Sequence, residues 1–294
     1  LRDRLEIVQI DGYSELEKLD IAKKYLVPNI LVSHGLSDFK IMDSVIINII
    51  RNYTKEAGVR ELERSLATIV RKVVTQIVKD KKKLCDIFID NNNINKYLGK
   101  CKYIKKRQNE NQIGVVNGLS CTQSGGEVMS IEVNYYKGKG NLILTGCLGD
   151  IIKESAMISL SYIKANYKKF NIRYEDLINN DIHIHIPSGS ILKEGPSAGV
   201  ALTTSIISAF TNFKVRDDIA MTGEITLRGN ILPVGGLREK SLGAFISNIK
   251  TMFIPVDNVS DLCEIPDDIK GKINYIPVKN YMEIFQKLGG LNVN

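Results

Sequence analysis

One short segment of the sequence combines a serine with neighbours that would expose its hydroxyl. Ser197 lies in KEGPSAGVAL, between a Gly-Pro and an Ala-Gly pair, immediately before a long apolar stretch. The segment fits the G-x-S-x-G pattern of the α/β-hydrolase nucleophile turn, but that fold requires an acid and a histidine after the serine. The histidines are His34, His183 and His185, and none follows Ser197. The hydrolase interpretation therefore fails, and a helix N-cap is the ordinary alternative for this serine.

The surroundings of Ser197 nevertheless favour a reactive hydroxyl. DIHIHI predicts a strand, and SAGVALTTSIISAF predicts a helix that is apolar nearly all round and therefore buried. Ser197 would lie at the N-terminus of this helix, where unpaired N–H groups and the positive end of the helix dipole stabilise negative charge. The same N–H groups could form an oxyanion hole for a tetrahedral intermediate.

Two candidates could accept the serine proton, and the first is a pair of histidines. His183 and His185 are two positions apart on the predicted strand, so their side chains share one face. Such a pair can also bind a metal ion, but the sequence shows no third ligand of matching spacing. Imidazoles hydrogen-bonded to neighbours on a half-exposed strand are the ordinary alternative.

The second candidate is Lys240, in LPVGGLREKSLGAF. On a helical wheel the expected core stripe consists of Leu242, Phe245, Ile246 and Ile249. Lys240 lies on the opposite face, together with Gly243, Ala244 and Ser247. An exposed lysine is ordinary at such a position. Small residues would, however, let another element approach and cover the amine, and burial lowers a lysine pKa towards the range that a general base needs. The sequence leaves both alternatives open.

The first part of the chain predicts a helical domain over residues 1–95. A helix is expected over 12–26, opened by Ser14 and Glu17 in capping-box spacing and ended before Pro28. A second helix is expected over 43–53. A third helix, GVRELERSLATIVRKVVTQIVKD, carries one apolar stripe, and CDIFID predicts a short closing strand.

The remaining chain predicts an α/β domain over residues 113–294, joined to the first by a basic linker over 96–112. Strands and helices alternate, which indicates α/β architecture, so the fold class is α+β or α/β with a helical N-terminal domain. Strands are expected over 113–119, 128–136, 141–146, 181–186, 218–225 and 251–256, and helices over 150–167, 197–210 and 237–249.

Charge is unevenly distributed along the chain, whose net charge is +7. Residues 71–107 carry twelve Lys or Arg against three Asp, so this segment could meet nucleic acid or an acidic surface. A solvated helix end and linker is the ordinary alternative, because no aromatic stacking platform accompanies the charges.

The five cysteines are scattered, which indicates a reducing compartment rather than a disulfide framework or zinc ribbon. No apolar run approaches the roughly 18 residues of a membrane span. The first residues, LRDRLEIV, do not resemble a signal peptide, and the chain begins as if cut from a longer one.

Two longer segments carry a family resemblance. DIHIHIPSGSILKEGPSAG followed by MTGEITLRGNILPVGGLREK resembles the protease domain of Lon, the ATP-dependent AAA+ protease family, and the spacing of Ser197 and Lys240 matches its catalytic pair. LRDRLEIV, GYSELEKLDIAKKYLVP and TKEAGVRELER resemble the helical lid subdomain of the Lon ATPase. The resemblance thus extends over both predicted domains.

The resemblance implies a role for each matching residue of the protease domain. Ser197 matches the nucleophile, Lys240 the general base, and Thr222 a threonine that helps to orient the lysine. His183 and His185 match a pair near the site that does not act as the primary base. Glu194 stands where many members have Asp, so its side chain is one methylene longer and its hydrogen bonds are left open.

In the lid, Arg60 matches the arginine that senses the nucleotide phosphates, and Tyr13 matches a residue near the adenine. No GxxxxGK[ST] loop occurs in the sequence, so most of the site for ATP and Mg²⁺ would lie outside this chain. We therefore expect that the chain by itself neither hydrolyses ATP nor binds it tightly.

The resemblance implies an ATP-dependent serine endopeptidase that degrades unfolded or damaged proteins and works as a homohexamer without a membrane partner. The alternative is a basic adaptor or nucleic-acid-binding module, with DNA held by residues 71–107 and an inert hydrolase-like domain. IAKKYLVP and YMEIFQKL look more like mitochondrial members, so the mitochondrial matrix is the expected location and the bacterial cytoplasm the alternative.

Overall fold

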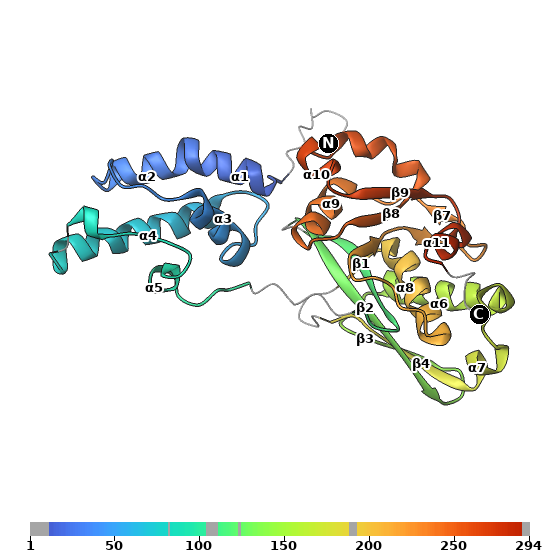
Figure 1. The fold of residues 1–294 in the computed structure, drawn as a ribbon. Helices are drawn as coiled ribbons and strands as arrows, with labels where there is room; N and C mark the ends of the chain where they lie inside the picture. The colour runs from blue at the N-terminus through green and yellow to red at the C-terminus, as the bar shows by residue number, and fades with distance from the viewer. Residues whose placement is uncertain (1–11, 82, 104–110, 123–124, 188–192, 290–294) are drawn as a thin grey trace, which may run out of the picture. The chain divides into compact units, whose positions relative to one another are not determined.

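The computed structural model describes residues 12–81, 83–103, 111–122, 125–187 and 193–289. The described chain forms a helical unit that ends at Tyr103 and a larger unit, with a central sheet, that begins at Asn111 (Figure 1). The expected linker 96–112 begins inside helix α5 (Ile94–Leu98), whose Ile94 and Tyr97 are buried in the helical unit. No helix in these described ranges is long and apolar enough to cross a membrane.

The helical unit follows the predicted order of helices. Its elements are α1 (Glu15–Ile21), a π-helical turn (Ala22–Leu26), α2 (Val27–Ser33), α3 (Asp43–Asn52), α4 (Arg60–Lys79), a 3₁₀ turn (Leu84–Asp86) and α5. The capping box at α1 is confirmed, because Ser14 Oγ accepts from Glu17 N at 3.2 Å and Glu17 Oε2 accepts from Ser14 N at 2.6 Å. The apolar stripe of α4 is also confirmed: Leu62, Leu66, Ile69, Val70 and Val73 are all buried.

Two local predictions for the helical unit are wrong. The first helix does not end before Pro28; the π-helical turn carries it into α2, and its wider winding admits a proline that has no N–H to donate. CDIFID does not form a strand. Its Ile87 and Ile89 are buried in the core of the helical unit, so the alternation reflects packing against helices without a partner strand.

The larger unit is built on a seven-stranded sheet of order β3-β4-β2-β1-β5-β8-β9. The strands are β1 (Val115–Thr122), β2 (Gly125–Lys137), β3 (Leu142–Thr145), β4 (Asn180–His185), β5 (Ile219–Met221), β8 (Thr251–Pro255) and β9 (Asn274–Val278). Strand β4 runs antiparallel to β2, whereas β3 is parallel to β4, and β1, β5, β8 and β9 are parallel neighbours. The predicted α/β domain is confirmed.

One predicted strand, over residues 218–225, is divided in the structure. It separates at Thr222 and Gly223 into β5 and β6 (Glu224–Ile225), and β6 pairs with β7 (Ile231–Leu232) in a small antiparallel ladder. Gly223 has φ +157°, and a Cβ there would lie 2.7 Å from Ile231 Cγ2, so the break requires glycine. The break leaves Thr222 at the carboxyl end of a buried parallel strand.

Helices cover both faces of the sheet. They are α6 (Asp150–Ala165), α7 (Tyr174–Ile178), α8 (Gly199–Thr211), α9 (Leu237–Ile246), α10 (Asp267–Lys270) and α11 (Tyr281–Lys287), with 3₁₀ turns at Tyr167–Phe170, Pro196–Ala198, Val256–Asn258 and Ser260–Glu264. Successive residues of β5 point to opposite faces: Met221 joins the core under α6, α8 and α11, and Ala220 joins the core under α9.

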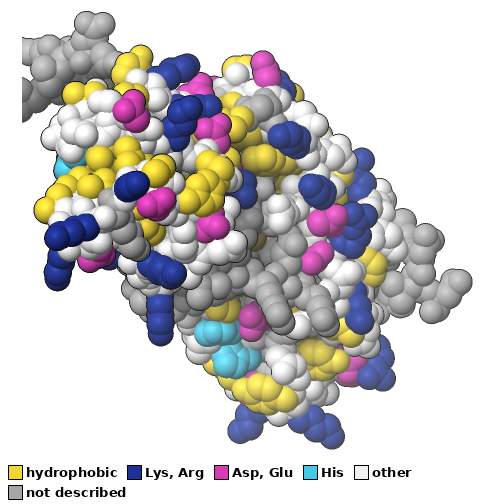
Figure 2. Space-filling model, turned by 60° about the vertical axis from the view of Figure 1, so that its left-hand side comes forward, with side chains coloured by type: hydrophobic (Ala, Val, Ile, Leu, Met, Phe, Trp, Pro, Cys, Tyr) yellow, Lys and Arg dark blue, Asp and Glu magenta, His cyan; other side chains and the backbone are white. Residues whose placement is uncertain are grey.

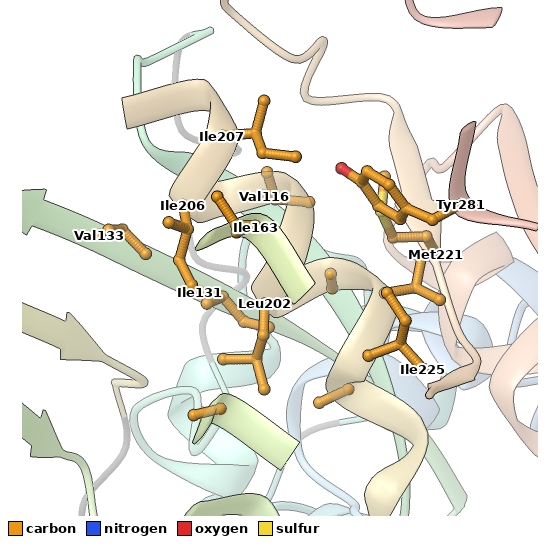
Figure 3. Packing of buried hydrophobic residues seen from close by; sticks show 14 of the residues in the cluster. Val116, Ile131, Val133, Ile163, Leu202, Ile206, Ile207, Met221, Ile225 and Tyr281 are labelled. Atoms are coloured by element: carbon orange, nitrogen blue, oxygen red, sulfur yellow. The ribbon is translucent and has the colours of Figure 1, made fainter. Parts of the chain in front are cut away.

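Helix α8 is the centre of the larger core, as its apolar sequence predicts. Every residue from Gly199 to Ala209 is buried, and Leu202 and Ile206 pack with Ile131 of β2 and Ile163 of α6 (Figure 3). Its buried hydroxyls have hydrogen-bond partners: Thr203 Oγ1, for example, donates to Gly199 O at 2.9 Å, and Ser208 Oγ donates to Phe213 O beyond the end of the helix. This rigid helix fixes the position of the segment that precedes it, which contains Ser197.

Candidate active site

Ser197 lies in a 3₁₀ turn, Pro196–Ala198, that leads directly into α8. Gly195 precedes the turn with φ +112°, a left-handed conformation that favours glycine, and Pro196 fixes φ at the first position of the turn. Ser197 itself is half-buried. Ser197 therefore lies at the N-terminal end of a buried helix, as predicted, and the preceding glycine and proline shape the turn that leads into it.

The backbone of Ser197 is held by the break after β5. Its carbonyl oxygen accepts a hydrogen bond from Gly223 N at 2.9 Å, and Thr222 Oγ1 lies 3.4 Å from the same oxygen. One turn later, Val200 N donates to Gly223 O at 3.1 Å. The nucleophile segment is thus fixed at the carboxyl end of a parallel strand, where α/β proteins place their functional groups.

Lys240 lies in α9 and is almost completely buried, with 2 % of its surface exposed. Its Nζ donates to Thr222 Oγ1 at 3.2 Å. Burial lowers the pKa of Lys240 from 10.5 to about 8, and the nearby Cys121 thiol group opposes this shift only in part. Within the described ranges no carboxylate forms an ion pair with Lys240. The charged form of the amine is therefore not stabilised by a described acidic side chain.

The burial of Lys240 decides between the two alternatives that the sequence left open. Gly243, one helical turn further along, contacts the backbone of Gly126 at the start of β2 so closely that a Cβ on either glycine would overlap the other element. The strand therefore covers the lysine face of α9. The expected core stripe was wrong in part, because Ile246 is 42 % exposed. The buried face of α9 instead includes Lys240, Gly243 and Ala244. The small residues of this face let the backbone of β2 pack directly on the helix, and this contact decides which face is buried.

Ser197 and Lys240 line one cavity of about 270 Å³. Its walls are Ser120, Cys121, Met129, Ile152, Glu194, Gly195, Pro196, Ser197, Ala198, Pro233, Val234, Gly235 and Lys240. Among the described residues no hydrogen bond joins Lys240 Nζ to Ser197 Oγ, and the amine is held by Thr222 instead. Catalytic hydrogen bonds are often long in ligand-free proteins and shorten when substrate binds, so this geometry is compatible with a Ser-Lys pair.

The two histidines lie elsewhere. His183 Nε2 and His185 Nδ1 both hydrogen-bond to Thr145 Oγ1 of β3, at 2.9 and 2.8 Å. Neither imidazole lines the cavity, and over the part of the chain that the structure describes no group of three metal-ligating side chains occurs. The pair is thus engaged with a neighbouring strand, as the ordinary alternative predicted for imidazoles on a half-exposed strand.

One residue near the cavity carried no recognisable signal in the sequence. Asn258, in the 3₁₀ turn after β8, is 4 % exposed and holds the cavity wall at Val234. Its Oδ1 accepts from Val234 N at 2.9 Å, and its Nδ2 donates to Val234 O at 2.8 Å and to Asp261 Oδ2 at 2.6 Å. An asparagine after a strand ordinarily indicates a turn, so only the structure shows this contact.

The two lid residues lie close to one segment of the helical unit. Tyr13 N donates to Ala57 O at 2.9 Å, and its side chain is 41 % exposed. Arg60 is the first residue of α4 and is exposed. The structure thus presents one aromatic ring and one guanidinium on neighbouring segments, both available to a ligand.

Comparison with known proteins identifies the family. A family model described as the Lon protease (S16) C-terminal proteolytic domain matches residues 88–289, and one described as the Lon protease AAA+ ATPase lid domain matches residues 32–85. The chain belongs to the Lon protease family. Residues 32–85 of the helical unit thus correspond to the Lon lid, and the last residues of that unit together with the larger unit correspond to the Lon proteolytic domain.

Curated relatives agree over nearly the whole chain. Lon protease of Rickettsia bellii is 47 % identical over 97 % of this chain, that of Syntrophomonas wolfei 47 % identical over 98 %, and that of Aster yellows witches'-broom phytoplasma 45 % identical over 98 %. The chain spans only 36 to 37 % of the length of these Lon proteases. All three are bacterial, so they do not support the expected mitochondrial location, and the bacterial alternative agrees with them.

Proposed function

We propose that this chain carries the peptide-bond hydrolysis site of an ATP-dependent Lon-type serine endopeptidase. The observation that carries the proposal is the burial of Lys240 in the same cavity as Ser197, with a threonine hydroxyl as its hydrogen-bond partner. A lysine in this setting loses its proton near pH 8 and can act as a general base. Family membership supports a serine peptidase, and the geometry supports the assignment of the pair.

The proposed reaction uses these two side chains in turn. The neutral Lys240 amine takes the proton of Ser197 Oγ as that oxygen attacks the peptide carbonyl carbon, and N–H groups near the start of α8 stabilise the resulting oxyanion. The C–N bond then breaks, and the Lys240 ammonium returns the proton to the leaving amine. A water molecule hydrolyses the acyl-Ser197 ester by the same proton transfers. Thr222 keeps the amine oriented through both steps.

Covalent labelling tests the proposal on the chain itself. A β-lactone acylates an activated serine hydroxyl, and mass spectrometry of the digested chain locates the ester. We expect acylation at Ser197, no ester on this peptide in Ser197→Ala, and a rate at least about 100-fold lower in Lys240→Ala. Ser161→Ala, which removes an exposed hydroxyl of α6, is the control and should react as the parent does. Equal acylation of the parent and Lys240→Ala would contradict the proposal.

Nucleotide binding in the complete protein is a further part of the proposal. Arg60 would contact the phosphates of ATP and Tyr13 the adenine, and ATP with Mg²⁺ would drive translocation of unfolded substrate proteins. Because the sequence lacks a phosphate-binding loop, these two residues alone offer too few groups to hold the phosphates. Calorimetry with this chain should detect no ATP affinity in the micromolar range, and such an affinity would contradict this assignment.

Assembly and location are proposed by analogy with the family. We propose that the complete protein forms a homohexamer, and that the bacterial cytoplasm, favoured by the bacterial relatives, is its location rather than the mitochondrial matrix. Light scattering of the complete protein tests the assembly, because a monomer at high concentration would contradict a hexamer.

DNA binding through the basic segment is a second candidate activity. Eight described Lys and Arg side chains of residues 71–107 are all exposed, and cationic side chains are spread over the visible face of the molecule among acidic ones (Figure 2). Binding should weaken steeply with salt, and neutralisation of Lys81, Lys82 and Lys83 should abolish it. Lys82 lies outside the described residues. A DNA affinity that does not change with salt or with these substitutions would exclude binding through this basic segment.

A further inference from the structure

Four hydrogen bonds attach the segment that leads to Ser197 to the start of α6 and to the residues just before it. Gly149 N donates to Lys193 O at 2.9 Å, and Lys193 N donates to Cys147 O at 3.1 Å. The Lys193 amine also donates to Gly146 O at 2.8 Å. Finally, Glu194 Oε1 accepts from Ile151 N, in the first turn of α6, at 3.2 Å. The chain is therefore fixed on both sides of the nucleophile, because Ser197 O is held by Gly223.

The last of these contacts is made by a side chain three residues before the nucleophile. The carboxylate of Glu194 lies at the N-terminal end of α6, where unpaired backbone N–H groups favour a negative charge. Gly149, the N-cap of α6, makes room for it, because a Cβ at Gly149 would overlap the Glu194 carboxylate. Glu194 lines the catalytic cavity as well, so it connects the helix end with the wall that contains Ser197.

We propose that Glu194 is a positioning residue for Ser197. Its carboxylate, seated at the N-terminus of α6 over Gly149, fixes the turn Gly195–Ser197 so that the serine hydroxyl faces the cavity. The inference rests on the proposed function of Ser197. Gly195 has a left-handed conformation and carries no side chain to restrain it, so the turn depends on what holds its two ends. The length of the glutamate matters, because its carboxylate must reach across to Ile151 N.

Gly149→Ala tests the contact without a change to Glu194 or to any other group of the cavity. The backbone of Gly149 is extended, with φ −71° and ψ 172°, so alanine is acceptable there, and the new methyl group displaces only the end of a flexible side chain. We expect normal thermal stability but about tenfold slower acylation of Ser197 by the β-lactone. The maximal rate constant should fall while the concentration at half-maximal rate changes little. Gly271→Ala, whose added Cβ would make only an ordinary van der Waals contact with Asp267 O at 3.6 Å, is the matched control.

Two substitutions of Glu194 complete the test. Glu194→Ala should slow acylation as Gly149→Ala does, whereas Glu194→Gln retains the length and the acceptor oxygen and should lose no more than about threefold. Equal rates in the parent and Gly149→Ala, or equal losses in Glu194→Gln and Glu194→Ala, would overturn the proposal.

A crystal structure separates failure of this proposal from failure of the proposed function. If the parent is not acylated at Ser197, the proposed function is wrong. The position of Ser197 in Gly149→Ala still decides the role of Glu194. We expect a displacement of Ser197 beyond the roughly 0.5 Å that a productive site tolerates. An unchanged position would overturn the proposal.

Discussion

Lys240 Nζ and Thr222 Oγ1 lie 3.2 Å apart, and both side chains are buried. The threonine comes from the break after β5 and the lysine from α9, so this hydrogen bond joins the two elements that surround the nucleophile turn. Thr222 Oγ1 also lies 3.4 Å from Ser197 O. A single hydroxyl thus contacts both partners of the proposed pair.

Substitution of Thr222 tests this arrangement. Thr222→Val keeps the shape of the side chain but removes the hydroxyl, so the Lys240 amine loses its partner and becomes free to rotate. We expect kcat for peptide hydrolysis to fall about 10- to 100-fold, which corresponds to the 1 to 3 kcal/mol of an unsatisfied buried polar group. Thr222→Ser retains the hydroxyl and should stay within about threefold of the parent. Equal activity of the valine and serine variants would contradict the role of Thr222.

The pH dependence of activity follows from the pKa of Lys240. Burial lowers this pKa to about 8, and the base must be neutral to accept the serine proton. Activity should therefore rise about tenfold per pH unit below pH 8 and level off above it. A histidine base of ordinary pKa, about 6.5, would give a plateau already near pH 7.5. A profile of kcat/KM against pH distinguishes these two outcomes.

Burial of the Lys240 amine should also reduce the stability of the folded chain at neutral pH. A pKa lowered from 10.5 to about 8 means that the charged amine reduces the free energy of unfolding by about 3 kcal/mol. Below pH 8 the amine is protonated in both the folded and the unfolded chain, so the full destabilisation is present. Between pH 8 and 10.5 the folded chain loses this proton before the unfolded chain does, and the destabilisation disappears as pH rises.

Lys240→Met should accordingly raise the free energy of unfolding at pH 7, by up to about 3 kcal/mol, and by much less near pH 10. Denaturant unfolding of the parent and the variant at the two pH values measures the difference. A methionine variant less stable than the parent at pH 7 would contradict a destabilising effect of the buried charged amine.

The close contact of Gly243 with Gly126 should be essential for the burial of Lys240. Gly243→Ala introduces a methyl group that overlaps the backbone of Gly126, so β2 must move away from α9. We expect a loss of about 1 to 3 kcal/mol in unfolding free energy. The apparent pKa of the pH–activity profile should move from about 8 towards 10.5 as water reaches the amine. Gly58→Ala, at an open glycine of the helical unit, is the control and should change neither quantity.

The sequence predicts much of the fold because local patterns and packing agree. The capping box at Ser14, the apolar stripe of α4 and the burial of α8 from Gly199 to Ala209 are all predictable from residue type and spacing. The predictions fail where tertiary contacts override local preference. The π-helical turn admits Pro28 into a continuous helical segment, and Ile87 and Ile89 pack on helices without forming a strand.

The site was predictable only in part, for a related reason. The glycine, proline and serine of the nucleophile turn carry their geometry in their own conformational preferences. The environment of Lys240 depends instead on a strand more than one hundred residues earlier, which approaches through Gly126. No pattern within α9 specifies that approach. The contact of Glu194 with Ile151 and that of Asn258 with Val234 are likewise long-range, and only the folded chain shows them.

The assignment of Lys240 as the base for Ser197 is tested most directly by measuring hydrolysis of a fluorogenic peptide. The rates to compare are those of the parent, Ser197→Ala, Lys240→Ala and His185→Ala. If Lys240 takes the serine proton, the first two substitutions should lower the rate at least about 1,000-fold, and His185→Ala should retain most of the activity. Continued activity of Lys240→Ala, together with loss of activity in His185→Ala, would contradict the Ser-Lys pair and assign the base to a histidine.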